Sequence, residues 1–447
     1  MSTPTRPSPT RITGTLLVLL LQLSAFGSDS SAKHPLKVFI LAGQSNMQGH
    51  ANVSTIESMA SDPKTAPILK LMRDAGGKPV VCDKVWISSV GCAGDGWSDV
   101  IEQTGKLTTG FGASPSEIGP EFTFGLYMEK ALREPILIIK TSWGGRSLMT
   151  DFRPPSAGSR MFSDYIQARW KERHQDVDKE EAKIRSESGV FYHHMIDHIR
   201  KVLGDIKRVV PTYDPKQGYQ LAGFVWFQGF NDMIDDWTYH DRMKSGAYGE
   251  YSQLLIDLIR DVRTDLSAPK LPFVIGVMGI DGLKADTKPP QSNFRLAQIA
   301  LTELPEFRGN VAAVRTAPFW DDDLDALQQR VEKLNSQFDQ QAKKNPTWTE
   351  EEKNAAHQKF IEATFTPDEL TRMKGISNGG YHYLGAAKIL APIGKAFAEA
   401  LLDLKNHRHS KGKLMKQLTP LPKDLEVALA ATSPSPIATH KAHPNCK

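Results

Sequence analysis

The chain has 447 residues, of which 40% are hydrophobic and 24% charged, so it is long enough to bury one large core or two smaller ones. Its formal net charge at pH 7 is only +4, and part of the excess comes from lysines near the C-terminus such as Lys413 and Lys441. A nucleic-acid-binding protein needs a dense basic face, so this composition argues against a nucleic-acid partner.

Residues 1–27 have the layout of an export signal. Arg6 and Arg11 precede the apolar run Thr15–Leu23, which is followed by small residues that suit a cleavage site. The run is about half as long as the roughly 20 apolar residues that a membrane span requires. We therefore expect an exported protein, periplasmic or secreted, that has no stable membrane span after cleavage. An uncleaved N-terminal anchor is the alternative.

Cysteines and metal-binding patterns are sparse. The three cysteines, Cys82, Cys92 and Cys446, provide no disulfide framework. A bridge between Cys82 and Cys92 stays open, although the apolar stretch Val85–Val90 between them would hold their ends apart. No CxxC or HExxH sequence occurs. The acidic run Asp321–Asp323 is better explained as a helix start than as a cation site, so we expect no metal and no cofactor.

Short apolar runs alternate with segments of helical spacing along the chain. The first run, Leu36–Ala42, ends at Gly43, a pattern typical of a buried parallel strand followed by a turn. Further runs are Val85–Val90, Pro135–Lys140, Gly223–Phe227, Pro272–Met278 and Val311–Val314. The helical segments are Glu121–Leu132, Phe191–Leu203, Tyr251–Leu266 and Asn293–Glu303. The alternation predicts an α/β fold with a central parallel sheet and helices on both faces.

Two charged segments interrupt this alternation. Residues 160–187 and 321–374 have the composition of solvated helices, and we expect both to be insertions that decorate the surface or edge a lid. A role in binding substrate is the alternative. Residues 406–447 have little periodicity and several prolines, so we expect a disordered basic tail. Residues 28–405 then form one domain.

A serine follows the first predicted strand directly, in the sequence Gly43-Gln44-Ser45-Asn46-Met47. Ligands of parallel sheets gather at the carboxyl ends of the strands. Gly43 permits a tight turn, and the N-terminus of the next helix would point N–H groups at the same place. This suits a nucleophile whose own amide helps to hold an oxyanion. The alternative is a serine that only caps the helix.

Two further strand ends carry groups that could stabilise a negatively charged oxygen. Ser142–Arg146 (SWGGR) follows the strand at 135–140, and its two glycines would let backbone amides approach a ligand closely. Trp226–Asp232 (WFQGFND) follows the next strand, and there the side-chain amides of Gln228 and Asn231 could donate hydrogen bonds. A turn or a helix cap is the simpler role for each segment.

His382 is the candidate general base. A base must accept the serine proton near neutral pH, which suits an imidazole. Most of the 13 histidines lie in charged helices or in the tail, whereas His382 lies in the glycine-rich stretch Asn378–Gly385, just before the last predicted helix, Leu384–Leu402.

These four segments, in this order, resemble the SGNH hydrolase superfamily, in particular its branch of carbohydrate acetylesterases and sialate O-acetylesterases. The strongest match is LAGQSNMQG at Leu41–Gly49, followed by the WxQG sequence at Trp226–Gly229. Gly119–Glu121 also looks like a stretch common in that branch. The resemblance covers roughly Lys37–Ala400 outside the charged segments, and it implies a three-layer, flavodoxin-like fold.

The resemblance also implies roles for single residues. Ser45 would be the nucleophile and His382 the base of an acyl-enzyme mechanism that needs no cofactor. The oxyanion would be held by the Ser45 amide, by an amide at Gly144 or Gly145, and by one side chain of the third segment. That side chain is Asn231 in the superfamily's GxND form and Gln228 in the carbohydrate-esterase form, and we favour Asn231.

Side chains around these segments could contact the substrate. Tryptophans could offer flat faces to sugar rings, although core positions are an equal alternative, and an arginine could contact a polar or acidic group. The residues concerned are Gln44, Asn46, Trp97, Trp143, Arg146 and Trp226.

Two positions depart from the family's pattern. Family members commonly carry Asp three residues before the histidine, where this chain has Gly379, with Asn378 one position further back. The loss leaves a Ser-His dyad or calls in a distant group, with Asn378, Glu121 and Asp232 as candidates. The branch also often has Glu after WxQG, where Phe230 stands.

We therefore predict an exported serine esterase that removes acetyl groups from a carbohydrate, such as acetylated xylan or acetylated sialic acid. An SGNH lipase or thioesterase is one alternative, which the mixed polar loop Thr150–Pro155 disfavours. A glycan-binding protein that lost catalysis with the missing Asp is the other. The presence of Ser45, His382 and Asn231 argues against it.

Overall fold

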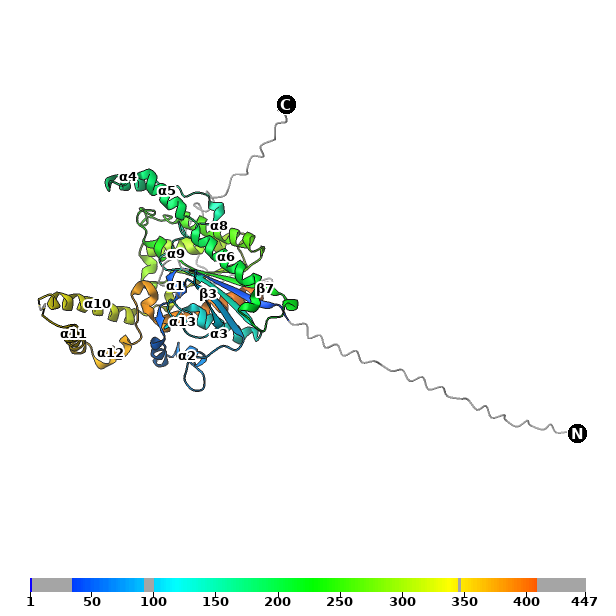
Figure 1. Ribbon diagram of the computed structural model, residues 1–447, viewed down its shortest axis with the longest axis horizontal. Coiled ribbons are helices and arrows are strands. Elements are labelled where there is room, and N and C mark those ends of the chain that lie inside the picture. Colours follow the sequence, from blue (N-terminus) through cyan, green and yellow to red (C-terminus); the bar gives the residue numbers. More distant parts are fainter. Residues whose placement is uncertain (2–33, 92–99, 345–346, 408–447) are drawn as a thin grey trace, which may run out of the picture. The chain divides into compact units, whose positions relative to one another are not determined.

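The computed structural model describes residues 1, 34–91, 100–344 and 347–407. The elements below all belong to one compact unit that begins at Pro35 (Figure 1). The expected signal at 1–27 and nearly all of the expected tail lie outside the described residues, as do Cys92, Trp97 and Cys446. The question of a Cys82–Cys92 bridge, which the sequence leaves open, therefore stays untested, and Cys82 itself is buried.

A seven-stranded sheet forms the core, in the order β4-β3-β6-β1-β7-β8-β9. Its strands are β1 (Leu36–Gly43), β3 (Val85–Val90), β4 (Glu102–Lys106), β6 (Ile136–Ser142), β7 (Tyr219–Phe227), β8 (Phe273–Val277) and β9 (Val311–Arg315). Neighbours pair in parallel except at the edge, where β4 is antiparallel to β3. A separate antiparallel pair joins β2 (Ala51–Asn52) to β5 (Glu117–Ile118). The predicted α/β class with a mostly parallel sheet is confirmed.

The strand order places a switch point at β1. When the β3–β4 edge is set aside, the order β6-β1-β7-β8-β9 is the flavodoxin order 2-1-3-4-5. Gly43 pairs with Ser142 of β6 on one side and with Phe227 of β7 on the other, so the three strands end at the same level. Open sheets of this kind bind ligands beyond the carboxyl ends of the strands at such a point.

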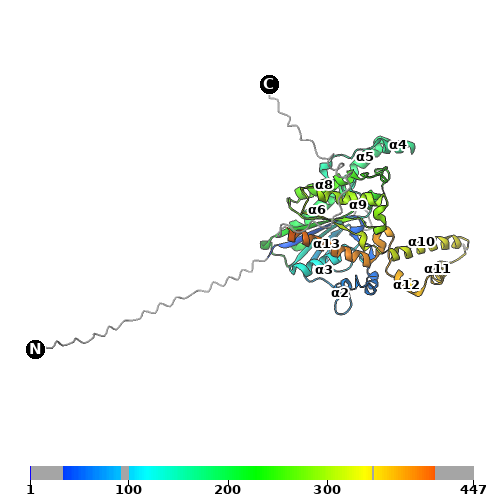
Figure 2. The same cartoon turned by 180° about the vertical axis from the view of Figure 1, so that it is seen from behind.

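Helices cover both faces of the sheet (Figures 1 and 2). On one face α3 (Pro120–Leu132) packs against α13 (Ala387–His407), and α6 (Val190–Gly204), α8 (Gly249–Asp265) and α9 (Gln291–Ala300) cover the other. The shorter helices are α1 (Ser45–Gln48), α2 (Ala66–Met72) and α7 (Phe230–Ile234). The 3-10 segments are η1 (Val53–Ser61), η2 (Pro155–Ala157), η3 (Ile206–Arg208), η4 (Pro215–Gln217), η5 (Leu283–Thr287), η6 (Leu301–Glu303), η7 (Ala317–Phe319) and η8 (Gly380–Gly385).

The last helix begins later than the sequence predicts. We expected it from Leu384, but α13 starts at Ala387. Leu384 and Gly385 have φ of 61° and 54°, a left-handed conformation that an α-helix of L-residues does not contain. The residues after His382 therefore form a bent loop. α13 continues to His407, so it includes the first two residues of the expected tail.

The two charged segments are helical. The first contains α4 (Asp164–Glu172) and α5 (Val177–Glu187), and the second contains α10 (Asp322–Ala342), α11 (Glu350–Thr364) and α12 (Pro367–Met373). α4 and α5 share a small apolar cluster with Phe162 and Trp237, whereas α10 packs against α11, α12 and η8. Asp321 caps α10 by accepting hydrogen bonds from the amides of Asp323 and Leu324. That both segments are insertions stays a prediction.

Of the helices in the described ranges, none is long and apolar enough to cross a membrane.

Candidate active site

The nucleophile candidate lies at the switch point. A Cβ atom at Gly43 would lie 2.1 Å from the carbonyl oxygen of Phe227, so glycine is required where the ends of β1 and β7 meet. Ser45 opens α1 in the turn that follows, with 6% of its surface exposed. Because α1 has only four residues, it contributes less macrodipole than the helix expected here.

Gln44 links the nucleophile turn to the third segment. Its side chain is fully buried, and its Oε1 accepts a hydrogen bond of 2.9 Å from the Gly229 amide. An acceptor at that atom leaves Nε2 as the donor of the 2.6 Å hydrogen bond to Asn231 Oδ1. The Nδ2 group of Asn231 is therefore the part of that amide that Gln44 does not engage. Gln44, expected to contact substrate, instead orients Asn231.

Gln228 is held inside the protein. Its Nε2 group donates to the Arg146 carbonyl at 3.1 Å and to Asp232 Oδ2 at 2.5 Å. Its Oε1 accepts from the Tyr251 hydroxyl at 3.1 Å, and the side chain is fully buried. Both amide hydrogens thus have protein acceptors. Of the two candidate oxyanion donors in this segment, Asn231 is the one whose side-chain NH2 group has no hydrogen-bond acceptor among the described residues.

The glycine pair lies beside the nucleophile. A Cβ atom at Gly144 would be 3.8 Å from Ser45 Cβ and 3.0 Å from Gln48 Oε1. Gly145 has φ of 71°, in the left-handed region that favours glycine. The predicted backbone donors and Ser45 are therefore brought together from the ends of β6 and β1.

The two predicted tryptophan contacts belong to the core. Trp143 is 1% exposed and Trp226 is fully buried. Phe152 packs against both rings, at 6.1 Å from Trp143 and 5.1 Å from Trp226. With so little exposed surface, neither ring presents a face to a sugar in this structure. Both tryptophans therefore contribute apolar surface to the core, as large aromatic side chains usually do.

The other predicted contacts differ in accessibility. The Asn46 amide is buried beside Ser45 and makes no hydrogen bond with any described residue. Arg146 is partly exposed, with its guanidinium 4.1 Å from the Phe191 ring centre and 3.2 Å from Asp151 Oδ1. These contacts fix the direction in which Arg146 extends.

The His382 ring is oriented by Asn378. Asn378 Oδ1 accepts a hydrogen bond of 2.8 Å from the Gly379 amide, so the atom that faces this site is the oxygen. His382 Nδ1 lies 3.1 Å from the same oxygen. An oxygen acceptor requires the proton to sit on Nδ1, which leaves Nε2 able to accept another. Of the three candidates for an orienting partner, Asn378 is the one in contact with His382.

Neither carboxylate candidate contacts His382. Asp232 accepts hydrogen bonds from the amides of Leu148 and Met149 and from Gln228, and burial raises the pKa of its carboxyl to about 6. It joins the third segment to the loop after the glycine pair. Glu121 binds Lys140 and the Gly119 amide.

Tyr383 anchors the loop that carries His382 to the sheet. Tyr383 has φ of 53°, an uncommon conformation for a residue other than glycine. Its buried hydroxyl accepts a hydrogen bond of 2.8 Å from the Gly279 amide and lies 2.6 Å from Thr316 Oγ1. These contacts at the ends of β8 and β9 hold the backbone in this conformation and so fix the place of His382.

His382 is uncharged near neutral pH. Burial and, to a smaller extent, the interaction with His50 lower the pKa of its imidazole to about 3, although Glu117 acts in the opposite direction. The His50 ring stacks on the His382 ring, with centroids 3.9 Å apart and planes within 4°. α1 packs against η8, but no hydrogen bond joins the side chains of Ser45 and His382 within the described part of the chain.

A buried ion pair lies under the nucleophile turn. Lys140 and Glu121 have side chains that are 0% exposed, with Nζ and Oε2 2.8 Å apart. Lys140 Nζ also donates to the carbonyl oxygens of Gln48 at 2.7 Å and Phe111 at 2.6 Å. The end of α1 is thereby fixed to β6. Lys140 belongs to no motif of the sequence, and its one signal there is its position at the end of an apolar strand, which is unusual for a lysine.

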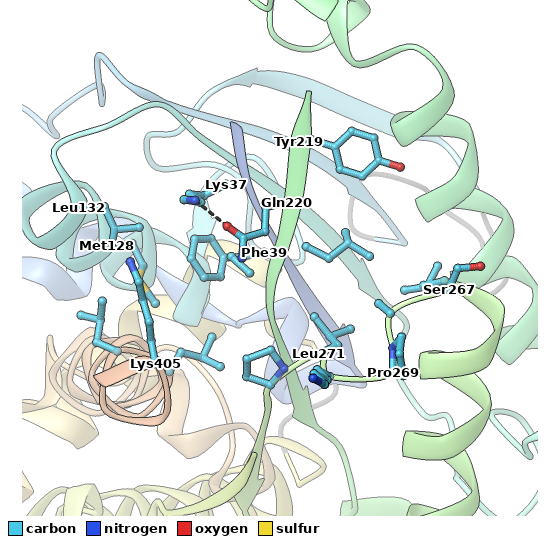
Figure 3. A pocket seen from close by; sticks show the side chains of 18 residues that line it. Lys37, Phe39, Met128, Leu132, Tyr219, Gln220, Ser267, Pro269, Leu271 and Lys405 are labelled. Carbon is cyan, nitrogen blue, oxygen red and sulfur yellow. Dashed lines mark hydrogen bonds between the residues drawn. The ribbon is translucent and has the colours of Figure 1, made fainter. Parts of the chain in front are cut away.

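A cavity of about 690 Å³ lies elsewhere, at the amino ends of β1 and β7 (Figure 3). Lys37 and Tyr219 come from the starts of these strands, and Lys37 Nζ donates to Gln220 Oε1 at 2.6 Å. Because Ser45 follows the carboxyl end of β1, this cavity is distinct from the candidate site.

Comparison with known proteins identifies a matching family model. The family model described as carbohydrate esterase, sialic acid-specific acetylesterase, matches residues 35–325. That range contains Ser45, Gly144 and Asn231 and ends before His382. No curated protein gives a significant match.

Two solved structures are similar over part of the chain. A protein from Arabidopsis thaliana is 18% identical, with 63% of this chain and 86% of that one covered and a TM-score of 0.33. A carbohydrate acetylesterase from Xanthomonas citri is 13% identical, with 62% and 49% covered and a TM-score of 0.33. Because the family model spans more than half of the chain, the protein belongs to the sialic acid-specific acetylesterase family of carbohydrate esterases.

Proposed function

We propose that the chain is an exported serine esterase that removes acetyl groups from a carbohydrate through an acyl-enzyme on Ser45, with His382 as the base. The observation that carries the mechanism is the Asn378 oxygen, which faces both the Gly379 amide and His382 Nδ1. It selects the tautomer whose Nε2 can take the serine proton. The uncommitted Asn231 amide group and the Gly144 backbone beside Ser45 support an oxyanion site at the same place.

The reaction follows from these positions. His382 Nε2 takes the Ser45 proton as Oγ attacks the ester carbonyl, and the backbone amides and Asn231 Nδ2 hold the negative oxygen. His382 then gives the proton to the sugar oxygen, which leaves as the alcohol. Water attacks the acetyl-serine with His382 again as base, and acetate is released.

Acetate release tests this proposal. The mature chain is incubated with acetylated xylan, acetylated sialic acid and p-nitrophenyl acetate, and acetate is quantified for the two carbohydrates. We expect turnover of at least one carbohydrate, and the relative rates identify the preferred sugar. A folded protein that releases nothing from any of the three would refute the esterase assignment and favour glycan binding, which a titration with the same sugars would measure.

Replacing Asn231 by alanine should lower kcat about a hundredfold, the loss typical of one missing oxyanion donor. KM should change little, because the donor acts mainly on charge that develops in the transition state. The control is Gln220→Ala at the opposite end of β7, where the side chain contacts Lys37 and the rate should be unchanged. Equal kcat values for the two variants would remove Asn231 from the mechanism.

An exposed aromatic side chain beside His382 supports a carbohydrate substrate. Tyr381 is 50% exposed, with its ring centre 4.4 Å from that of His382 and 6.2 Å from that of Phe230. The structure thus offers this ring in place of the buried tryptophans. Tyr381→Ala should raise KM up to about tenfold for the acetylated carbohydrate, because one aromatic stacking contact is worth about 0.5–1.5 kcal/mol.

The comparison that tests Tyr381 uses an ester without a ring. KM for ethyl acetate should be the same for Tyr381→Ala and for the unmodified protein, and Tyr381→Phe should keep the carbohydrate KM. An equal rise in KM for both esters would mean that the substitution disturbs His382 and not a sugar contact.

Export rests on the N-terminal sequence, with Arg6 and Arg11 before the apolar run Thr15–Leu23. Expression of the full chain in a bacterial host should place the protein outside the cytoplasm. N-terminal sequencing of that product should show that about the first 27 residues are missing. Recovery of the intact chain in the cytoplasm would count against export.

A further inference from the structure

The proposed Ser45–His382 mechanism creates a cation in a partly buried place with a neutral partner. When His382 Nε2 takes the serine proton, the ring becomes an imidazolium, and its Nδ1 proton points at the Asn378 amide oxygen. An amide fixes the tautomer but brings no negative charge, which is the second task of the carboxylate in most triads. A different group must supply that charge.

One carboxylate reaches His382 through a second imidazole. His50 lies face to face with His382, at 3.9 Å between ring centres, and its Nδ1 lies 3.7 Å from Glu117 Oε1. Both side chains are largely covered, with 19% of His50 and 16% of Glu117 exposed. The three groups therefore form a row from β5 to the loop η8.

Backbone pairing and hydrogen bonds hold Glu117, His50 and His382 next to one another. Glu117 lies in β5 and His50 directly precedes β2, and these two strands pair with each other. Ser377 Oγ donates to the His50 carbonyl at 3.2 Å and accepts from the Asn52 amide at 3.0 Å. The loop that carries His382 is thus bonded to the segment that carries His50.

The charge and proton positions in this row are defined by its surroundings. Burial alone would raise the pKa of the Glu117 carboxyl, but its interactions with His50, Ser114 and His382 lower it overall, so Glu117 is ionised at neutral pH. His50 Nε2 is buried and has no hydrogen-bond partner among the described residues. A single proton on Nδ1, facing Glu117, is the tautomer that these contacts support.

We propose that Glu117, acting through the stacked ring of His50, is the acid partner of His382, and that both are positioning residues of the esterase site. Glu117 keeps the His50 proton on Nδ1 and polarises the neutral ring, whose electron-rich face then lies against the His382 imidazolium. A second proton on His50 would have the opposite effect, because its positive charge would face the imidazolium. The inference rests on the proposed Ser45–His382 mechanism.

A double-mutant cycle tests the row with p-nitrophenyl acetate as substrate. Glu117→Gln removes the charge and keeps the shape, and we expect kcat to fall about tenfold with KM unchanged, since the charge acts on the imidazolium and not on the bound ester. His50→Phe keeps a stacked ring and should cost a similar factor. The combined variant should be no slower than His50→Phe alone, because the charge acts through His50.

Controls separate this role from a structural one. Asp257→Asn on α8 removes a carboxylate of equal exposure, 16%, and should leave kcat unchanged. All variants should unfold within a few degrees of the unmodified protein. Glu117→Asp should recover part of the lost kcat, because it restores the charge at a longer distance.

The outcomes distinguish the inference from the function on which it rests. A Ser45→Ala protein that hydrolyses the ester as fast as the unmodified protein refutes the mechanism itself. If Ser45→Ala is inactive while Glu117→Gln stays within twofold of the unmodified protein, only the inference fails. If the loss of kcat in the double variant equals the product of the losses in Glu117→Gln and His50→Phe, then Glu117 acts without His50 and the proposed role of His50 is refuted.

Discussion

Ser45→Ala and His382→Ala should each lower kcat/KM for acetyl esters about a thousandfold or more. In the proposed mechanism Ser45 Oγ forms the acyl-enzyme, and His382 Nε2 takes its proton because the Asn378 oxygen holds the ring's own proton on Nδ1. The effects of substitutions in one proton-transfer unit are not additive, so the double variant should be no slower than either single variant. Steady-state kinetics on p-nitrophenyl acetate and on the preferred carbohydrate measure the losses.

Covalent labelling checks the nucleophile independently of turnover. A fluorophosphonate should phosphonylate Ser45, and mass spectrometry should find the label on the peptide that contains it. The Ser186→Ala protein, changed on the surface of α5, should be labelled and active like the unmodified chain. Ser45→Ala should take up no label. If Ser45→Ala kept more than a tenth of the activity of the unmodified protein, another residue would have to attack the ester.

The sequence predicts the scaffold well because the strands are almost fully buried. β1, β3, β6 and β8 are near-continuous apolar runs, as expected for strands covered on both faces. The edge strand β4 has the sequence EQTGK and carries no apolar residue, so its pairing with β3 is not visible in a hydrophobic pattern. A position after a parallel strand also predicts which end of the sheet a residue occupies, and it placed Ser45, Gly144 and Asn231 correctly at one edge.

The direction of side chains within those short turns could not be predicted. Gln44 and Gln228 lie in motifs at the site, yet both amides are buried and bonded to the protein. Trp143 and Trp226 follow the same pattern, since their burial depends on Phe152 from a loop distant from Trp226 in the sequence. Sequence position selects the edge of the sheet, whereas packing between segments decides which side chains face outward.

The missing aspartate at position 379 is a second case in which the sequence predicts a position but not a side-chain contact. The sequence shows that the usual carboxylate is missing and names three replacements. The structure selects Asn378, because its oxygen is the one that lies next to His382 Nδ1. Glu117 and His50 belong to no recognised motif in the sequence, and their contact with His382 depends on the β2–β5 pair.

Replacing Lys140 by methionine should lower the free energy of unfolding by about 3–5 kcal/mol, the usual cost when one partner of a buried ion pair is removed. The change leaves the Glu121 carboxylate buried with the backbone amides of Gly119 and Glu121 as donors, and the carbonyl oxygens of Gln48 and Phe111 lose the donor that Lys140 provides. Urea unfolding at pH 7, followed by circular dichroism, measures the loss.

The double variant Lys140→Met/Glu121→Gln separates the cost of the charge from the cost of the geometry. It has no charge at these two buried positions, so it should recover part of the stability that Lys140→Met loses. Burial raises the pKa of Glu121, and removal of Lys140, which lowers it, must raise that pKa further. A folded-state pKa above the unfolded value means that stability falls as pH rises, so the deficit of Lys140→Met should be smaller at pH 5 than at pH 8. A loss of less than 1 kcal/mol that does not vary with pH would show that the pair is not what holds α1 against β6.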